Sequence, residues 1–200
     1  MQNEIDLQKL KDHPGKVRGA VFETDAKYVQ KKLGDEALAK LQQATKELGW
    51  EINYKDIQTM GWYPIGQRAI SILAAQKAFG WKDQEVRDMG SSAPKYSFIA
   101  TMMMKYFVSL KKVFEEIPTY WEKHYTAGKI EPVLLDEENG RMVLHLKDFV
   151  LHPVLCQYYA GYFERLGRYV VKGAKVETKE TKCNFRGDDF HEMTVSWKKE

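Results

Sequence analysis

The residues best suited to chemistry lie in one C-terminal stretch, VETKETKCNFRGDDFHEMTVSW, which runs from Val176 to Trp197. It places a carboxylate, a thiol and an imidazole, those of Glu180, Cys183 and His191, within twelve positions. These side chains bind zinc in proteins, and a structural zinc ion takes four such ligands in a tetrahedral arrangement. The stretch has two interpretations: part of a metal site, or the ordinary side chains of a β-hairpin.

The spacing within this stretch bears on that choice. Glu180 and Cys183 are three residues apart, so a regular strand would point them to opposite faces of a sheet. A shared site therefore requires a bulge or a bend near Thr181. In the alternative interpretation, Cys183 is a small core residue and Glu180 is solvated. His191 then lies on the buried face of its strand together with Met193.

The elements that would position these residues follow from the periodicity. Residues 17–23 predict a short strand, and the chain up to residue 128 otherwise predicts helices. Glu138-Asn139-Gly140 indicates a hairpin turn, because Asn-Gly favours the tight turn between two strands. A helix over 151–167 and a second hairpin follow, with its turn at 184–189. This order predicts an α+β fold, with an antiparallel sheet from the C-terminal half and helices packed mainly on one side.

Composition limits the class of protein. The net charge is +3, with 31 basic and 28 acidic residues, and such a balance argues against a nucleic-acid binder. There is no signal peptide and no run of about 18 apolar residues, so no membrane span is expected. Two cysteines do not form a disulfide framework and indicate a reducing cytoplasm. We expect a polar lead-in over residues 1–15 and a single domain over 16–200.

No assembled catalytic constellation is present. The chain lacks a glycine-rich phosphate loop and a Gly-x-Ser-x-Gly motif, and its five histidines are scattered. These absences favour a protein that binds over one that catalyses. An enzyme of tetrapyrrole or aromatic metabolism is the weaker alternative.

Several segments together resemble one superfamily. KVRGAVFETDAKYVQKKLGDEALAKL is similar to the start of heme nitric-oxide-binding domains. HPVLCQYYAGYFERLGR followed by VETKETKCNFRGDDFHEMTVSW resembles the 4-vinyl reductase domain, a related branch. The resemblance covers roughly residues 16–198. It implies an α+β ligand-binding fold that encloses an apolar pocket, often dimerises, and acts as a sensor or binding module in the cytoplasm.

The resemblance also bears on cofactors. In relatives that sense phenols, a helix cysteine joins a Glu-x-x-Cys motif and a later cysteine, so it implies zinc held by Cys156, Glu180, Cys183 and His191. Cys156 lies one turn before the position that the family pattern predicts, which leaves the fourth ligand open. The heme branch carries a Tyr-x-Ser-x-Arg motif, which this sequence lacks. No histidine lies between Trp62 and Leu110, where a proximal ligand is expected, and this argues against heme.

The ligand pocket is predicted from apolar and aromatic residues on two helices. A Met- and aromatic-rich helix and a tyrosine-bearing face of the late helix suit a concave apolar site. The predicted lining is Trp62, Tyr96, Phe98, Met102, Tyr106, Tyr158, Tyr159 and Tyr162. The first functional hypothesis is therefore a non-enzymatic sensor or carrier of a small apolar molecule. The alternatives are a closed core without a pocket, and an interaction module that forms a homodimer or contacts a signalling protein.

Overall fold

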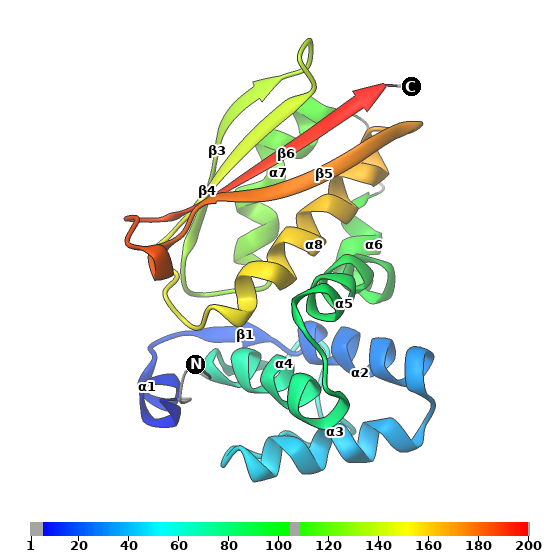
Figure 1. Cartoon of the computed structure of the whole chain (residues 1–200), viewed down its shortest axis with the longest axis vertical. Coiled ribbons are helices and arrows are strands. Elements are labelled where there is room, and N and C mark those ends of the chain that lie inside the picture. The colour runs from blue at the N-terminus through cyan, green and yellow to red at the C-terminus, as the bar shows by residue number, and fades with distance from the viewer. Residues whose placement is uncertain (1–5, 105–108, 200) are drawn as a thin grey trace.

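The computed structural model describes residues 6–104 and 109–199. Most helices form one half of the molecule, and an antiparallel sheet forms the other half (Figure 1). In chain order, the helices before the sheet are α1 Leu7–Asp12, α2 Ala20–Leu33, α3 Glu36–Glu47, α4 Gly66–Phe79, α5 Asp83–Tyr96, α6 Phe98–Met104 and α7 Leu110–Glu122. Two short strands, β1 Lys16–Arg18 and β2 Trp62–Pro64, pair with each other beside them.

The C-terminal half contains the main sheet. Its strands are β3 Lys129–Asp136, β4 Arg141–Lys147, β5 Ala174–Lys182 and β6 His191–Lys199, in the spatial order β3-β4-β6-β5. Helix α8, Val154–Val170, crosses between this sheet and the helical half (Figure 1). The inward residues of the sheet, such as Leu144 and Val195, are buried against α7 and α8. The α+β fold with an antiparallel C-terminal sheet is therefore confirmed.

Two segments differ from the prediction. The strand expected over 17–23 ends at Arg18, and α2 begins at Ala20. A short apolar run suits a buried helix as well as a buried strand, and Ala20, Val21 and Phe22 are all buried within α2. The Met- and aromatic-rich region expected as a helix is interrupted, because α5 ends at Tyr96 and α6 begins at Phe98. Within α6, Phe98 has 61% of its surface exposed and Met102 46%, so this helix is not covered on all sides.

The lead-in over residues 1–15 contains helix α1. Its Leu10 is buried, and its backbone carbonyl lies against Gly66 at the start of α4. None of the described helices is long and apolar enough to cross a lipid bilayer.

Helices α5 and α8 approach each other more closely than side chains would allow. A Cβ atom on Gly90 would lie 1.9 Å from the carbonyl oxygen of Tyr158, and one on Gly161 would lie 1.9 Å from that of Arg87. The two glycines therefore let the helix backbones touch. This contact sets the position of α8, which carries Cys156 and the three predicted pocket tyrosines.

We expect Gly90→Ala and Gly161→Ala each to lower the free energy of unfolding by about 3 kcal/mol, because the added methyl group pushes the helices apart. In an open helix the same change would stabilise by up to about 1 kcal/mol. Urea unfolding followed by circular dichroism measures the effect. Lys95→Ala, exposed on the same α5 helix, is the control and should change little. An unchanged or higher midpoint for the glycine variants would contradict the close crossing.

Candidate functional site

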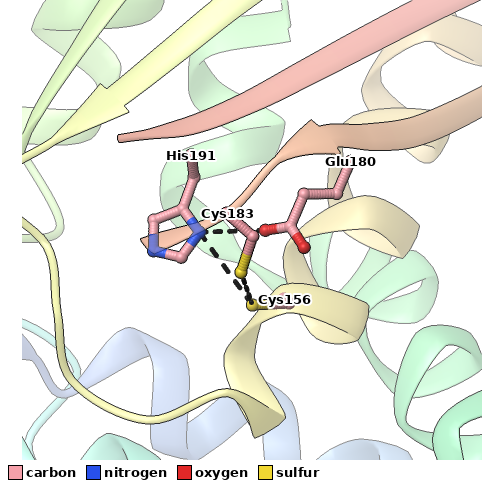
Figure 2. A group of neighbouring side chains, drawn as sticks. All are labelled: Cys156, Glu180, Cys183 and His191. Carbon is pink, nitrogen blue, oxygen red and sulfur yellow. Dashed lines mark hydrogen bonds and ion pairs between the residues drawn. The ribbon is translucent and has the colours of Figure 1, made fainter. Parts of the chain in front are cut away.

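Four polar side chains meet where the first turn of α8 faces the β5–β6 hairpin (Figure 2). Cys156 comes from α8, Glu180 from the end of β5, Cys183 from just after it, and His191 from the start of β6. Their candidate ligand atoms all lie within 4.8 Å of one another. This group is called the four-residue cluster below.

A bulge brings Glu180 and Cys183 to the same face. The pairing of β5 with β6 shifts register between Glu180 and Lys182, so Thr181 is the extra residue. Thr178 and Glu180 point inward before the bulge, and Cys183 is buried after it. The local geometry that a shared site requires is therefore present.

The distances within the cluster suit a tetrahedral ion. The Sγ atoms of Cys156 and Cys183 are 3.7 Å apart. Metal–sulfur bonds of about 2.3 Å in a tetrahedron place two sulfurs about 3.8 Å apart. Nδ1 of His191 lies 4.0 Å from Sγ of Cys156 and 2.9 Å from Oε1 of Glu180. A small inward movement of the imidazole would complete the tetrahedron.

The second ring nitrogen of His191 orients its side chain. Nε2 lies 3.2 Å from the backbone oxygen of Phe149, and because a carbonyl can only accept, Nε2 donates its hydrogen there. Nδ1 then faces Glu180 and Cys156. Metal-binding histidines commonly donate their other N–H to a carbonyl in this way.

The charges within the cluster depend on contacts among its side chains. Burial opposes ionisation of Glu180, but contacts from His191 and Cys156 outweigh it and lower the pKa of the carboxyl group. Burial and the neighbouring Glu180 charge raise the pKa of the Cys156 thiol. Without a cation, the cluster holds a carboxylate beside a neutral thiol; with a divalent cation, both thiols can ionise. Four protein ligands would leave no open position for catalysis, so the arrangement suits a structural ion.

A separate apolar cavity of about 540 Å³, including space open to solvent, lies among α2, α5, α7 and α8. Ligand sites are typically concave and mostly apolar, and this cavity has both features. Most of its walls are apolar or aromatic. The lining is Ala20, Val21, Thr24, Ala93, Ser97, Ile117, Tyr120, Trp121, His124, Tyr125, Ile130, Tyr158, Tyr159, Tyr162, Phe163 and Leu166.

His124, in the turn after α7, is the basic group in this lining. Its Nδ1 lies 3.0 Å from the backbone oxygen of Tyr120, which can only accept, so Nδ1 carries the hydrogen. Burial lowers the pKa of His124 to about 4, so the ring is neutral at physiological pH. Nε2 is then an unprotonated acceptor. His124 lies outside the window between Trp62 and Leu110 in which a ligand histidine was expected.

The predicted pocket residues fall into two groups. Tyr158, Tyr159 and Tyr162 line the cavity, and the hydroxyl groups of Tyr162 and Tyr120 share a hydrogen bond. The structure places four others outside the lining. Trp62 lies under the Arg18 guanidinium, Tyr96 packs at the edge of the core, and Phe98 and Met102 are largely exposed. Tyr106 lies outside the described residues.

The segment TYWEKHYTAGK, which spans the end of α7 and the turn after it, contained the signal that the sequence analysis missed. Tyr120, Trp121 and His124 are at spacings i, i+1 and i+4, which places them on one side of a helix. All three are buried and line the cavity.

No protein-family model and no curated protein matches this sequence. Solved structures do match its fold. An H-NOX protein from S. oneidensis in the Fe(II) ligation state has a TM-score of 0.69 at 12% identity, covering 92% of this chain and 97% of that one. The chain has the H-NOX fold. An oxygen-binding H-NOX domain related to soluble guanylate cyclases has a TM-score of 0.61 at 12% identity, with 90% and 95% covered. A structure from work on heme distortion in the H-NOX family also scores 0.61, at 14% identity, with 92% and 95% covered.

These findings correct the cofactor prediction. The solved proteins of this fold include an Fe(II) form, one studied for heme distortion and an oxygen complex, so the expectation against heme was wrong. These structures give zinc no support. The expectation rested on a window between Trp62 and Leu110, and the histidine in the cavity lining, His124, lies outside it.

The cavity fits heme in part. Its aromatic walls suit a flat apolar ring, and Nε2 of His124 is a nitrogen able to bond to iron, as histidine does in many heme proteins. Among the described lining residues there is no lysine or arginine to pair with the two propionates.

The neutral state of His124 predicts a pH dependence of stability. Its pKa is lower in the folded protein, about 4, than in the unfolded chain, about 6.5, so the unfolded chain binds more protons between these values. Stability should therefore fall as the pH falls, by about 2 kcal/mol at pH 5 from this residue. Urea midpoints at pH 7 and pH 5 test this. His124→Gln should reduce the loss, whereas His145→Gln, outside the cavity lining, is the histidine control. An equal loss in wild type and His124→Gln would contradict the prediction.

Proposed function

We propose that this chain is a non-enzymatic sensor or carrier domain whose cavity binds a small apolar molecule. The observation that carries the proposal is the apolar cavity between α2, α5, α7 and α8, with the neutral imidazole of His124 in its wall. Apolar walls supply the affinity, and a few polar groups orient the ligand. The H-NOX fold supports the proposal, because its solved members include an oxygen-binding domain.

The polar groups in the wall limit which ligands fit. His124 offers an acceptor at Nε2, and the Tyr120–Tyr162 hydroxyl pair lies in the same lining. Burial raises the pKa of both tyrosines, so they remain protonated and can donate. The cavity therefore suits an uncharged molecule. Heme is the second candidate, and the specific observation in its favour is His124 in the cavity of an H-NOX fold.

We expect native mass spectrometry of gently purified protein to detect a bound small molecule. We also expect added ethylbenzene to raise the melting temperature, because it enters the cavity. Ala20→Leu should abolish this rise, because the larger side chain fills cavity space beside α2. Ala39→Leu, an exposed position on α3, is the matched control and should keep the rise.

The same samples distinguish the two candidates. A Soret absorption band after addition of hemin, lost in His124→Gln, would identify heme as the ligand. If no small molecule co-purifies, and neither ethylbenzene nor hemin changes the melting temperature, the cavity is part of a closed core and the proposed function is wrong.

We further propose that the four-residue cluster binds a divalent metal ion that ties α8 to the hairpin. Its support is the 3.7 Å spacing of the two sulfurs and the orientation of Nδ1 of His191 toward Glu180 and Cys156. Two thiolates, a carboxylate and an imidazole are a donor set that selects thiolate-binding transition metals over Mg²⁺ or Ca²⁺. Elemental analysis identifies the ion.

We expect about one ion per chain in protein purified without chelator, held through four ligands. Cys183→Ser and His191→Gln should lower the melting temperature in metal-replete protein and much less after chelator treatment. His145→Gln, on the other face of the same sheet, is the matched control and should retain the ion. Metal content should fall as pH falls, because the thiol ligands must lose their protons. Wild-type protein with no ion, and with no response to chelator, would show that the cluster is an ordinary hairpin.

The cluster also supports the finer assignment to the 4-vinyl reductase type, since it joins the Glu-x-x-Cys segment to a helix cysteine. We retain the proposal that residues 16–200 form one ligand-binding domain, located in the cytoplasm. A homodimer and a signalling partner stay predictions, since the structure contains a single chain.

A further inference from the structure

A charged pair lies fully buried behind one wall of the cavity. The Arg68 guanidinium on α4 has 0% of its surface exposed and donates through Nη1 to Oδ2 of Asp25 on α2. The hydroxyl of Ser71 donates to the same carboxylate oxygen at 2.7 Å. The charge of Arg68 is thus balanced within the protein. The remaining N–H groups of the guanidinium are available for other partners.

Several polar atoms around this pair lack a well-aligned partner. In the part of the chain that the structure describes, Nε and Nη2 of Arg68, Oδ1 of Asp25 and the hydroxyl of Tyr159 are buried without a well-aligned hydrogen bond, and the hydroxyl of Tyr125 interacts with both Arg68 and Tyr159. Such atoms are rare in folded proteins, and each calls for an explanation. Three of the four are hydrogen-bond donors.

These donors adjoin the cavity. The guanidinium carbon of Arg68 lies 4.1 Å from the ring centre of Tyr158, and Tyr158, Tyr159 and Tyr125 all line the cavity. The rings of Tyr125 and Tyr159 meet edge to face, with centres 6.2 Å apart. Arg68 acts electrostatically on all three tyrosines, which are its neighbours across this wall. Burial raises the pKa of Tyr159, so its hydroxyl stays protonated and able to donate.

We propose that this end of the cavity is a subsite for the carbonyl oxygen of an uncharged ligand, which accepts from the Tyr159 hydroxyl with Arg68 behind it. The inference rests on the proposed function of the cavity and specifies the ligand class, a neutral apolar ketone, ester or quinone. It also gives Tyr159 a role as the residue that selects for that oxygen.

The charge balance favours a neutral ligand. Asp25 already compensates Arg68, so a carboxylate ligand would add an unpaired negative charge to a buried region, which is strongly unfavourable. The excess of donors favours an acceptor. A carbonyl oxygen only accepts, so it can satisfy the free donors without bringing a further donor into the apolar cavity.

Three probes of similar size test the subsite: acetophenone, which has a neutral carbonyl; ethylbenzene, which has no acceptor; and benzoate, which is an anion. Isothermal titration calorimetry measures their affinities for wild type, Tyr159→Phe and Tyr169→Phe. Tyr159→Phe removes only the hydroxyl. Tyr169→Phe makes the same change on the same helix outside the cavity lining, and serves as the matched control.

We expect wild type to bind acetophenone about tenfold more tightly than ethylbenzene, which corresponds to one satisfied hydrogen bond, and to bind benzoate least. In Tyr159→Phe the acetophenone preference should fall to near one, with ethylbenzene affinity unchanged; in Tyr169→Phe the preference should persist. Equal affinity of wild type for acetophenone and ethylbenzene, or a preference that survives Tyr159→Phe, would overturn the subsite and leave the cavity function intact. If neither neutral probe binds, the subsite and the proposed cavity function both fail.

Discussion

Backbone contact between α5 and α8 is the constraint on which both candidate sites depend. Gly90 and Gly161 remove the side chains that would hold these helices apart. Helix α8 can therefore lie deep enough to bury Tyr158 and Tyr159 on one side while its first turn still reaches the sheet. Ordinary helix packing separates helix axes by about 8–10 Å according to the side chains at the contact, and here glycines at the contact let the two backbones touch.

The buried pair of Asp25 and Arg68 joins the helical half to α8. Removing two charges from water is costly, and their mutual attraction offsets that cost only when the geometry is good. Ser71 shares the carboxylate oxygen, and Tyr158 covers the guanidinium, so this pair has support from three elements. Removing one partner would leave an uncompensated charge in the core, at a cost of about 3–5 kcal/mol.

The sequence predicts local features better than distant contacts. Asn139-Gly140 sets the first hairpin because a tight turn needs a left-handed residue, and Gly140 has a φ of 66°. A shared site for Glu180 and Cys183 requires a bulge or bend near Thr181, because strand geometry alternates with period two, and the structure has the bulge there. Both features depend only on neighbouring residues.

The cavity lining was harder to predict because it is assembled from four helices whose packing no local pattern encodes. Phe98 and Met102 are of residue types common in pocket linings, yet 61% and 46% of their surfaces are exposed. His124 and Arg68 were missed because a single buried polar residue resembles a surface residue in sequence. Only the tyrosine-bearing face of α8 was found in advance, since its residues share one helix and one side.

Because of the bulge at Thr181, the four-residue cluster depends on the number of residues between Glu180 and Cys183. Deleting Thr181 would remove the bulge, keep Glu180 opposite Met193 and Lys182 opposite Glu192, and leave Glu180 and Cys183 two positions apart on one face. Inserting one residue would instead require a second irregularity to keep the two side chains together. The cluster should therefore tolerate loss of the bulge residue better than a one-residue insertion.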